Sequence, residues 1–402
     1  MNILFVTVAW PGKGKRNLYS DLIHTFRDHG HSVHVLTSQP KRSGETTSYI
    51  KENRIDVLRV RTGNISKTGP LEKSLSLLML GWQLKAGVNK YMRYKEFDLI
   101  LFNTPPVTLS GFLKYLKRLY DCPLYLLLKD MWPYGFADNG LIKENGIIYN
   151  FFKKHEKRLF EISDYIGCMS PAGVGFVRDK YPKMAPEKLE VCPNSIKIKK
   201  REKLHKDRTN SLQVRKKYGI PEDATVFIFS GNLGLGHGLD FLTDAIHELR
   251  DYSKAFFMIG GAGTHYERVK KVFDRENPKN AMIYSYLPQE DYNELIKTCD
   301  VGMILLSSKY NYPQFPSRLL SYLNEKMAVL CAVNDETDIG DIVQKSGAGI
   351  SVLHGDMAAF TRSVKFLSEN KNKVSKMGEN AFNLLEEEYS SEKSYEIIMS
   401  HF

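Results

Sequence analysis

A glycine-rich segment, residues 230–238, is the clearest candidate for ligand binding in this sequence. It contains Gly231, Asn232, Gly234 and His237, and it lies between an apolar run and a stretch with helical periodicity. Glycines let the backbone turn sharply and approach a ligand, and the free N–H groups at a helix start attract an anion. The segment therefore indicates a cradle for a phosphate-bearing ligand. A tight turn without a ligand is the alternative. The spacing differs from the GxGxxG dinucleotide fingerprint.

Two further segments of the second half could assist this cradle. A second glycine turn, residues 259–263, closes the next predicted strand. Ser317 and Arg318 follow Pro316, a residue that suits the first turn of a helix. The Ser317 hydroxyl could bind phosphate, and the Arg318 guanidinium could add a planar fork of donors. A capped surface helix with an exposed arginine is the alternative.

Two segments of the first half could act on a second substrate or on the same phosphate. Asp130 directly follows the apolar run 124–128, so it would lie at the carboxyl end of a strand. There it could orient or deprotonate an acceptor hydroxyl, or it could simply cap a helix. Gly14 lies in a basic loop, residues 10–16, where the backbone could contact a ligand. A mobile surface loop is the alternative for this second segment.

Several kinds of site are absent from the sequence. No GxSxG, P-loop or HExxH motif is present, and the five cysteines form no CxxC pair. The acidic loop 334–338 has no accompanying histidine or cysteine. We therefore expect no metal, no cofactor and no disulfide framework, and a cytoplasmic location follows as the default.

The net charge of +11 is compatible with nucleic acid, an acidic membrane surface or a phosphorylated substrate. The charge is spread along the chain apart from one dense run, residues 197–208. No nucleic-acid motif accompanies it, so we expect no nucleic-acid partner. An apolar stretch at residues 71–82 is too short to span a membrane. It could rest on an anionic membrane surface, or it could pack in the core of the first domain.

The elements that must position these residues alternate between strands and helices, which predicts an α/β protein with parallel sheets. Expected strands are residues 3–8, 33–37, 57–60, 99–102, 124–128, 165–169, 225–229, 256–259, 282–284, 301–305 and 329–332. Length and pattern together predict two Rossmann-like domains that face each other across a cleft, where open parallel sheets bind ligands.

The expected domain boundaries follow the same pattern. Residues 1–196 would form the first domain and bind the acceptor, and residues 212–384 would form the second and bind the donor. The polar stretch 197–211 would link them. The pattern also allows a C-terminal helix, at about residues 385–402, that packs back on the first domain.

These motifs, in this order, resemble the GT-B glycosyltransferases, and more narrowly glycosyltransferase family 4. The resemblance covers nearly the whole chain and includes the segments 30–37, 193–196 and 285–290. The motifs at residues 130–133 and 316–318 are similar to the D-x-W-P and P-S-K motifs of a subgroup that builds bacterial surface polysaccharides.

The resemblance implies transfer of a sugar from a nucleotide donor, with retention at the anomeric carbon and without a metal. It places Gly14 near the donor phosphates or sugar, while the position of Asp130 at a strand end would put it near the acceptor. In the second domain it implies a donor site formed by Gly231, Asn232 and Gly234 at the diphosphate, Leu287 at the base, Ser317 and Arg318 at phosphate or sugar, and Ser321 near the ribose. The family's basic pair near the phosphates is absent, so His237 or Arg318 would substitute for it.

The chain departs from the family pattern at further positions, among them Lys13 in place of the first of two glycines and Lys326 and Ala328 in place of a Gly-x-Pro strand entry. Many members carry two glutamates eight residues apart, where this chain has Pro313 and Ser321. Our hypothesis is a retaining glycosyltransferase that uses a UDP-linked hexose or N-acetylhexosamine and a glycan or polyprenyl-linked acceptor, in capsule or O-antigen synthesis. A nucleotide-sugar 2-epimerase has the same two-domain layout and is one alternative. A non-catalytic partner that binds a nucleotide sugar is the other.

Overall fold

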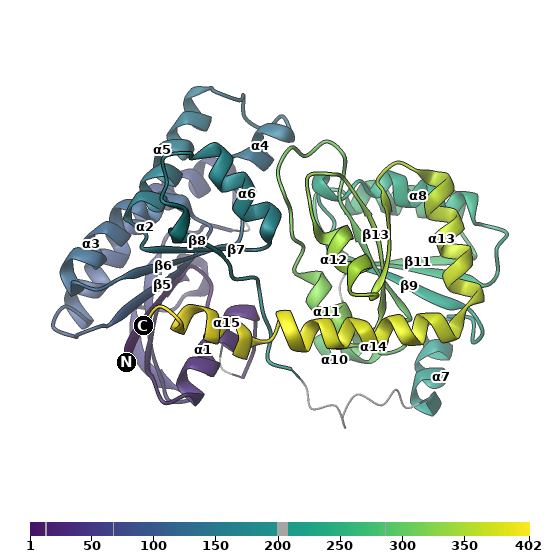
Figure 1. Ribbon diagram of the computed structural model, residues 1–402, viewed down its shortest axis with the longest axis horizontal. Helices are drawn as coiled ribbons and strands as arrows, with labels where there is room; N and C mark the ends of the chain where they lie inside the picture. The colour runs from purple at the N-terminus through teal and green to yellow at the C-terminus, as the bar shows by residue number, and fades with distance from the viewer. Residues whose placement is uncertain (13, 67, 199–207, 286) are drawn as a thin grey trace. The chain divides into compact units, whose positions relative to one another are not determined.

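The computed structural model describes residues 1–402 except 13, 67, 199–207 and 286 (Figure 1). The chain divides into two compact units, one made of Met1–Lys197 with Ser390–Phe402 and the other of Ile198–Tyr389. Most of the predicted linker, and most of the basic run in it, lies outside the described residues. Helix α7 (Arg208–Lys217) begins within the segment predicted as linker. Thr, Asn and Ser favour helix starts as well as loops, so polar composition alone does not separate the two.

The first unit is built on an eight-stranded sheet whose neighbours are parallel except for the edge strand β3, which is antiparallel to β4. Its order is β3 (Ser48–Glu52), β4 (Ile55–Thr62), β2 (Ser32–Pro40), β1 (Asn2–Thr7), β5 (Leu99–Asn103), β6 (Leu124–Leu128), β7 (Tyr165–Cys168) and β8 (Leu189–Val191). The central strands are buried on both faces and are therefore continuous apolar runs, which the sequence analysis predicted as strands. The strands β3 and β8 were not predicted.

Helices cover both faces of this sheet (Figure 1). One face packs against α1 (Leu18–Asp28) and α15 (Ser391–Met399), and a hydrogen bond between Thr25 and Ser391, 2.8 Å long, joins these two helices. The other face carries α2 (Pro70–Tyr91), α3 (Ser110–Tyr120) and α5 (Ile147–Ile162). Shorter helices are α4 (Tyr134–Asp138) and α6 (Pro171–Lys180).

The C-terminal helical pattern forms two helices rather than one. Helix α14 (Lys371–Glu388) belongs to the second unit, and α15 belongs to the first. The break falls at Tyr389 and Ser390, where the Ser390 hydroxyl accepts a hydrogen bond from the Lys393 N–H and begins a new helix. The chain thus returns to the first sheet through α15.

The apolar stretch 71–82 belongs to the N-terminal half of α2 and does not pack in the core as a whole. The face of α2 that meets the protein is formed by Ser76, Leu80, Leu84 and Val88. Leu77 is half-buried, and the remaining large apolar side chains of the stretch are solvent-exposed. Periodicity shows which residues share a helix face but not which face meets the sheet. The alternative that residues 71–82 pack in the core of the first domain is therefore wrong for the exposed face.

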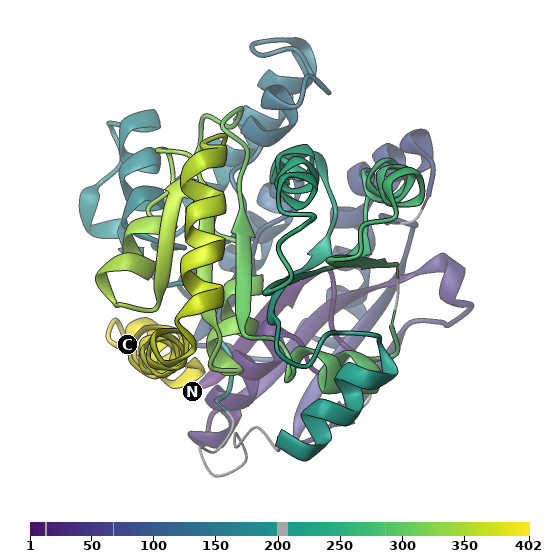
Figure 2. The same ribbon diagram turned by 90° about the vertical axis from the view of Figure 1, so that its right-hand side faces the viewer.

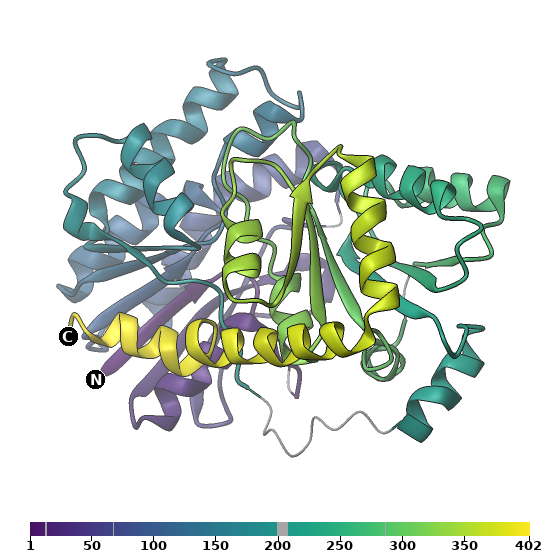
Figure 3. The same ribbon diagram turned by 45° about the vertical axis from the view of Figure 1, so that its right-hand side comes forward.

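The second unit is built on a six-stranded parallel sheet. Its order is β11 (Ala281–Tyr284), β10 (Ala255–Ala262), β9 (Thr225–Asn232), β12 (Val301–Leu305), β13 (Ala328–Val333) and β14 (Gly349–Leu353), of which only β14 was not predicted. Two of the covering helices, α8 (Leu239–Glu248) and α13 (Met357–Glu369), share one buried core with the central strands. Figure 2 shows α13 in front of the strands and alongside them, with α14 end-on, and Figure 3 shows α14 along its length.

The remaining helices of this unit follow individual strands. They are α9 (Tyr266–Glu276), α10 (Gln289–Ile296), α11 (Arg318–Asn324) and α12 (Ile339–Lys345). Among the described residues, no helix is long and apolar enough to cross a bilayer.

A glycine in β12 lets α11 approach the sheet closely. A Cβ atom at Gly302 would lie 2.2 Å from Cγ of Tyr322, whose ring is fully buried. The Tyr322 hydroxyl in turn accepts a hydrogen bond of 3.3 Å from the Ser230 N–H, near the end of β9. The missing side chain at Gly302 therefore sets the position of α11 relative to the glycine-rich turn.

We predict that Gly302→Ala destabilises the second unit by about 1–3 kcal/mol, the usual range for overpacking a core. Urea unfolding of the full chain would measure this change. Gly175→Ala is the matched control, because Gly175 lies in α6 with no atom within 4 Å of the added Cβ. An unchanged unfolding midpoint for Gly302→Ala would show that Tyr322 is not held in this way.

Candidate functional site

The ends of β9 and β10 lie against each other backbone to backbone. Gly261 pairs with Gly231 in register and has a φ of +135°. A Cβ atom at Gly261 would lie 1.8 Å from the Gly231 carbonyl oxygen, and one at Gly263 would lie 2.4 Å from the Leu233 carbonyl oxygen. Only glycine can occupy these positions without moving the neighbouring strand. The two predicted glycine turns therefore form one continuous edge of exposed backbone.

The segment 231–238, which covers the end of β9 and the turn after it, is exposed at its start and buried at its third residue. Gly231 and Asn232 are exposed, while Leu233 is fully buried. Gly234 then leads into a short 3₁₀ turn that ends at Gly238. Gly238 has a φ of +55°, and a Cβ atom there would lie 2.0 Å from Nε2 of His354. Backbone groups of the open part are thus available to a ligand.

Arg318 lies beside this turn and is held on three sides. Its guanidinium is 4.0 Å from the centre of the Phe229 ring. Nη2 donates to the Asn232 carbonyl oxygen at 3.2 Å and lies 3.1 Å from Nε2 of His237. Nη1 is buried and has no hydrogen-bond partner among the described residues. A buried guanidinium nitrogen without a partner is costly, and an anion would satisfy it, so this atom is a candidate for anion binding.

His237 cannot supply the positive charge that the sequence analysis considered for it. Burial, and then the charge of Arg318, lower its pKa to about 3. Nδ1 lies 3.2 Å from the Leu305 carbonyl oxygen, so it carries the proton, and Nε2 is the acceptor for Arg318. The neutral imidazole therefore orients the guanidinium instead of replacing a basic residue.

The other predicted donor-site residues surround this edge less closely. Ser317 and Ser321 are exposed, at and near the start of α11, and no side-chain cap forms at Ser317. Leu287 is half-buried between β11 and α10, and its neighbour Tyr286 lies outside the described residues. Pro313, in place of the family's first glutamate, is half-buried before α11. The structure puts all of them in the second unit.

Sequence reasoning missed two tyrosines that hold the strand end. The hydroxyls of Tyr292 and Ser230 are 2.9 Å apart, and Tyr322 accepts from the Ser230 N–H. Both tyrosines come from helices, α10 and α11, that are far from Ser230 in the sequence. No local motif could have found them, because the contact depends on how the helices pack.

Asp130 lies in the first unit, two residues after β6. The Thr104 hydroxyl accepts from the N–H of Lys129 at 2.9 Å and is 3.5 Å from the N–H of Asp130, which orients this turn. Solvent reaches the Asp130 side chain, but the protein around it displaces enough water to raise its pKa to about 6. The charge of Asp130 also raises the pKa of nearby Tyr19, although burial is the larger cause.

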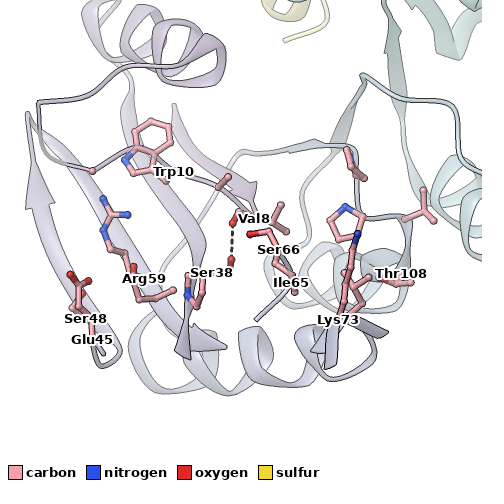
Figure 4. A pocket seen from close by; sticks show the side chains of 18 of the residues that line it. Val8, Trp10, Ser38, Glu45, Ser48, Arg59, Ile65, Ser66, Lys73 and Thr108 are labelled. Atoms are coloured by element: carbon pink, nitrogen blue, oxygen red, sulfur yellow. Dashed lines mark hydrogen bonds between the residues drawn. The ribbon is translucent and has the colours of Figure 1, made fainter. Parts of the chain in front are cut away.

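A pocket of about 780 Å³ opens in the same unit (Figure 4). Trp10 and Gly12 bring the loop of Gly14 to its wall, and Trp132 brings the segment that follows Asp130. Gly14 itself has a φ of +78°, and its neighbour Lys13 lies outside the described residues. The structure thus brings the two predicted segments of the first unit to one cavity, which the sequence analysis did not anticipate.

No group of three or more His, Cys, Asp or Glu side chains among the described residues could hold a metal ion. In the acidic loop, the Asn334 amide instead donates to the carbonyl oxygens of Ser307 and Tyr310.

The pKa of His237 gives a test of this arrangement. An unfolded chain protonates histidine near pH 6.5, whereas folded His237 would protonate only near pH 3. The contribution of neutral His237 to the free energy of unfolding is therefore fully present above pH 6.5 and is lost as the pH falls below this value. We predict that the His237 signals in an NMR titration do not shift between pH 5 and pH 8. A titration near pH 6.5 would contradict the neutral, buried acceptor.

Comparisons with known proteins agree on both halves of the chain. Residues 210–384 match the family described as glycosyl transferases group 1, and residues 16–200 match glycosyltransferase family 4. The probable glycosyltransferase WbjE of Pseudomonas aeruginosa is 21% identical over 304 residues, which cover 76% of this chain and 74% of the relative.

Solved structures share the fold at low sequence identity. Sucrose-phosphate synthase from Thermosynechococcus elongatus has a TM-score of 0.74 at 14% identity, and the match covers 100% of this chain and 98% of that one. HepE from Anabaena, solved with UDP-glucose, has a TM-score of 0.69 at 15% identity and coverage of 100% and 99%. With family matches over both sheets, the chain belongs to glycosyltransferase family 4 and has the GT-B fold.

Proposed function

We propose that this glycosyltransferase moves a sugar from a nucleotide-sugar donor to an acceptor hydroxyl, with retention and without a metal. One observation carries the proposal. The buried Nη1 of Arg318 has no partner among the described residues, and it belongs to a guanidinium fixed beside the exposed backbone of Gly231 and Asn232. A diphosphate would supply the missing acceptor, and backbone N–H groups could contact its other oxygens.

The proposed donor is a UDP-linked hexose or N-acetylhexosamine. HepE was solved with UDP and with UDP-glucose, and another similar structure holds UDP-2-fluoro glucose. Leu287 would contact the base, Ser321 would lie near the ribose, and Ser317 would bind phosphate or sugar. His237 would contribute by fixing Arg318, and Gly14 by a backbone contact to phosphate or sugar.

Charge stabilisation is the proposed source of catalysis. A fixed guanidinium and oriented N–H groups stabilise the charge that develops on the leaving diphosphate, usually the largest catalytic contribution. No enzyme nucleophile is proposed. The acceptor hydroxyl would attack the anomeric carbon from the face that the diphosphate leaves, and the departing phosphate would take the hydroxyl proton. Asp130 would position the acceptor.

The proposed setting is synthesis of a bacterial surface polysaccharide on the cytoplasmic side. WaaG, described as a glycosyltransferase involved in lipopolysaccharide biosynthesis, shares the fold with a TM-score of 0.67. The resemblance of residues 130–133 and 316–318 to the surface-polysaccharide subgroup also supports this setting. All five cysteines are buried thiols without disulfides, which favours a reducing compartment.

Arg318→Ala tests the donor site. We predict that it weakens UDP-glucose binding about 10- to 100-fold, because a hydrogen bond to a charged group contributes about 1.5–3 kcal/mol. Calorimetry would measure the dissociation constant, with Arg318→Lys expected between the two. The control is Arg268→Ala, which removes a surface arginine of the same unit that pairs with Asp240. Equal affinity for wild type and Arg318→Ala would exclude this role.

Asp130→Asn tests the acceptor role. We predict a loss of about 10²-fold in kcat, because a misplaced acceptor hydroxyl costs rate even though the phosphate takes its proton. Because the pKa of Asp130 is about 6, wild-type activity should fall as the pH drops below this value, and the variant should lack that limb of the profile. A full rate of transfer by Asp130→Asn would refute the role. Product analysis without acceptor would reveal a 2-epimerase instead.

A further inference from the structure

The exposed face of α2 is apolar over three turns. Relative exposures are 89% for Leu71, 64% for Leu75, 55% for Leu78 and 72% for Trp82. Positions i, i+4, i+7 and i+11 lie on one side of a helix, so these side chains form one stripe. Met79, on the same side, is also exposed. Monomeric proteins rarely expose contiguous apolar surface of this kind without a binding role.

A second apolar group begins α5. Ile147 and Ile148 have relative exposures of 91% and 58%, and Phe151 follows one turn later with 37%. Helix α2 packs on α3, and α3 packs on α5, so the two groups belong to one helical layer. Leu77 of α2 and Phe152 of α5, which are next in sequence to Leu78 and Phe151, line the 780 Å³ pocket. Exposed apolar residues therefore flank the pocket on both helices.

The helical layer is also basic. Helix α2 carries three lysines and one glutamate, and α3 carries two lysines, one arginine and no acidic residue. Helix α5 carries four basic residues and two glutamates. This excess of positive charge repels a second copy of the same face and attracts an anionic surface. Lys117, Lys153 and Lys157 are paired with carboxylates, but the layer keeps a net positive charge. Exposed apolar side chains on a basic helical layer, with a tryptophan among them, suit the interface of an anionic bilayer.

The pocket between these helices has matching chemistry. Trp10, Ile65, Leu77 and Trp132 give it apolar and aromatic walls. Lys73 lines it opposite Trp10 in Figure 4 and has no ion-pair partner among the described residues. Arg59, in contrast, is neutralised by Glu52 at 3.0 Å. The free ammonium and the apolar walls fit a phosphate attached to a hydrocarbon chain.

We propose that the membrane face, defined as Leu71, Leu75, Leu78, Met79 and Trp82 of α2 with Ile147, Ile148 and Phe151 of α5, docks on an anionic lipid bilayer. The adjoining pocket then receives a lipid-linked acceptor, with its phosphate at Lys73, directly from the bilayer. The assignment of the pocket to a lipid-linked acceptor rests on the proposed function, whereas docking on the bilayer does not.

Tryptophan fluorescence tests docking directly, because the chain has three tryptophans and the other two line the pocket. With Trp10→Phe and Trp132→Phe, Trp82 is the sole reporter. Vesicles of equal parts phosphatidylglycerol and phosphatidylcholine with brominated chains should quench its emission. Without the reporter substitutions, Leu75→Glu with Leu78→Glu should weaken co-sedimentation with unbrominated vesicles about tenfold or more. The control is Leu353→Glu, which changes an exposed leucine of the second unit and should not weaken co-sedimentation.

Docking would be overturned if brominated lipid did not quench the emission of Trp82, or if the Leu75 and Leu78 variant bound vesicles as well as the wild type. It would also be overturned if, without vesicles, the wild type self-associated and the variant was monomeric, because the face would then be an interface between copies. No donor is present, so these results are independent of the proposed function. Farnesyl phosphate probes the pocket in a Trp82→Phe protein, where it should change the emission of Trp10 and Trp132. Lys73→Gln should weaken this response about tenfold. No response to farnesyl phosphate would overturn the acceptor assignment and leave docking standing.

Discussion

The contact between the ends of β9 and β10 is the constraint on which the donor site depends. Gly261 lies so close to the Gly231 carbonyl oxygen that no side chain fits between them. The strands can therefore stay paired to their last residues, Asn232 and Ala262, and still present bare backbone. In an open parallel sheet this carboxyl edge is where ligands bind. A side chain at Gly261 would separate the strands and cover the edge.

The electrostatics of the site follow from this packing. Arg318 lies beside this edge, over the Phe229 ring, and donates to the Asn232 carbonyl oxygen. The same burial lowers the pKa of His237, which stays neutral and can accept from Arg318. One cation is thus fixed by a ring, a carbonyl and an imidazole, none of which neutralises its charge. That charge remains available to an anion.

The sequence predicted the central strands well because they are continuous apolar runs, and β6 was predicted with both ends correct. The edge strand β3 was missed, because its mixed side chains lack that signal. At the site, the glycine turn and Arg318 were found from local motifs. The neutral state of His237 and the bond from Ser230 to Tyr322 were not, because they depend on residues distant in sequence. For α2, periodicity grouped the apolar residues but could not show which group would be buried.

In the proposed function, Arg318 holds the diphosphate of the donor at the edge formed by the two glycine turns. A crystal structure of the protein with UDP would test it most directly. We predict a phosphate oxygen about 2.7–2.9 Å from Nη1 of Arg318, the usual length of a charged hydrogen bond, with Gly231 and Asn232 alongside. A diphosphate bound elsewhere, with Nη1 of Arg318 still unpaired, would contradict it.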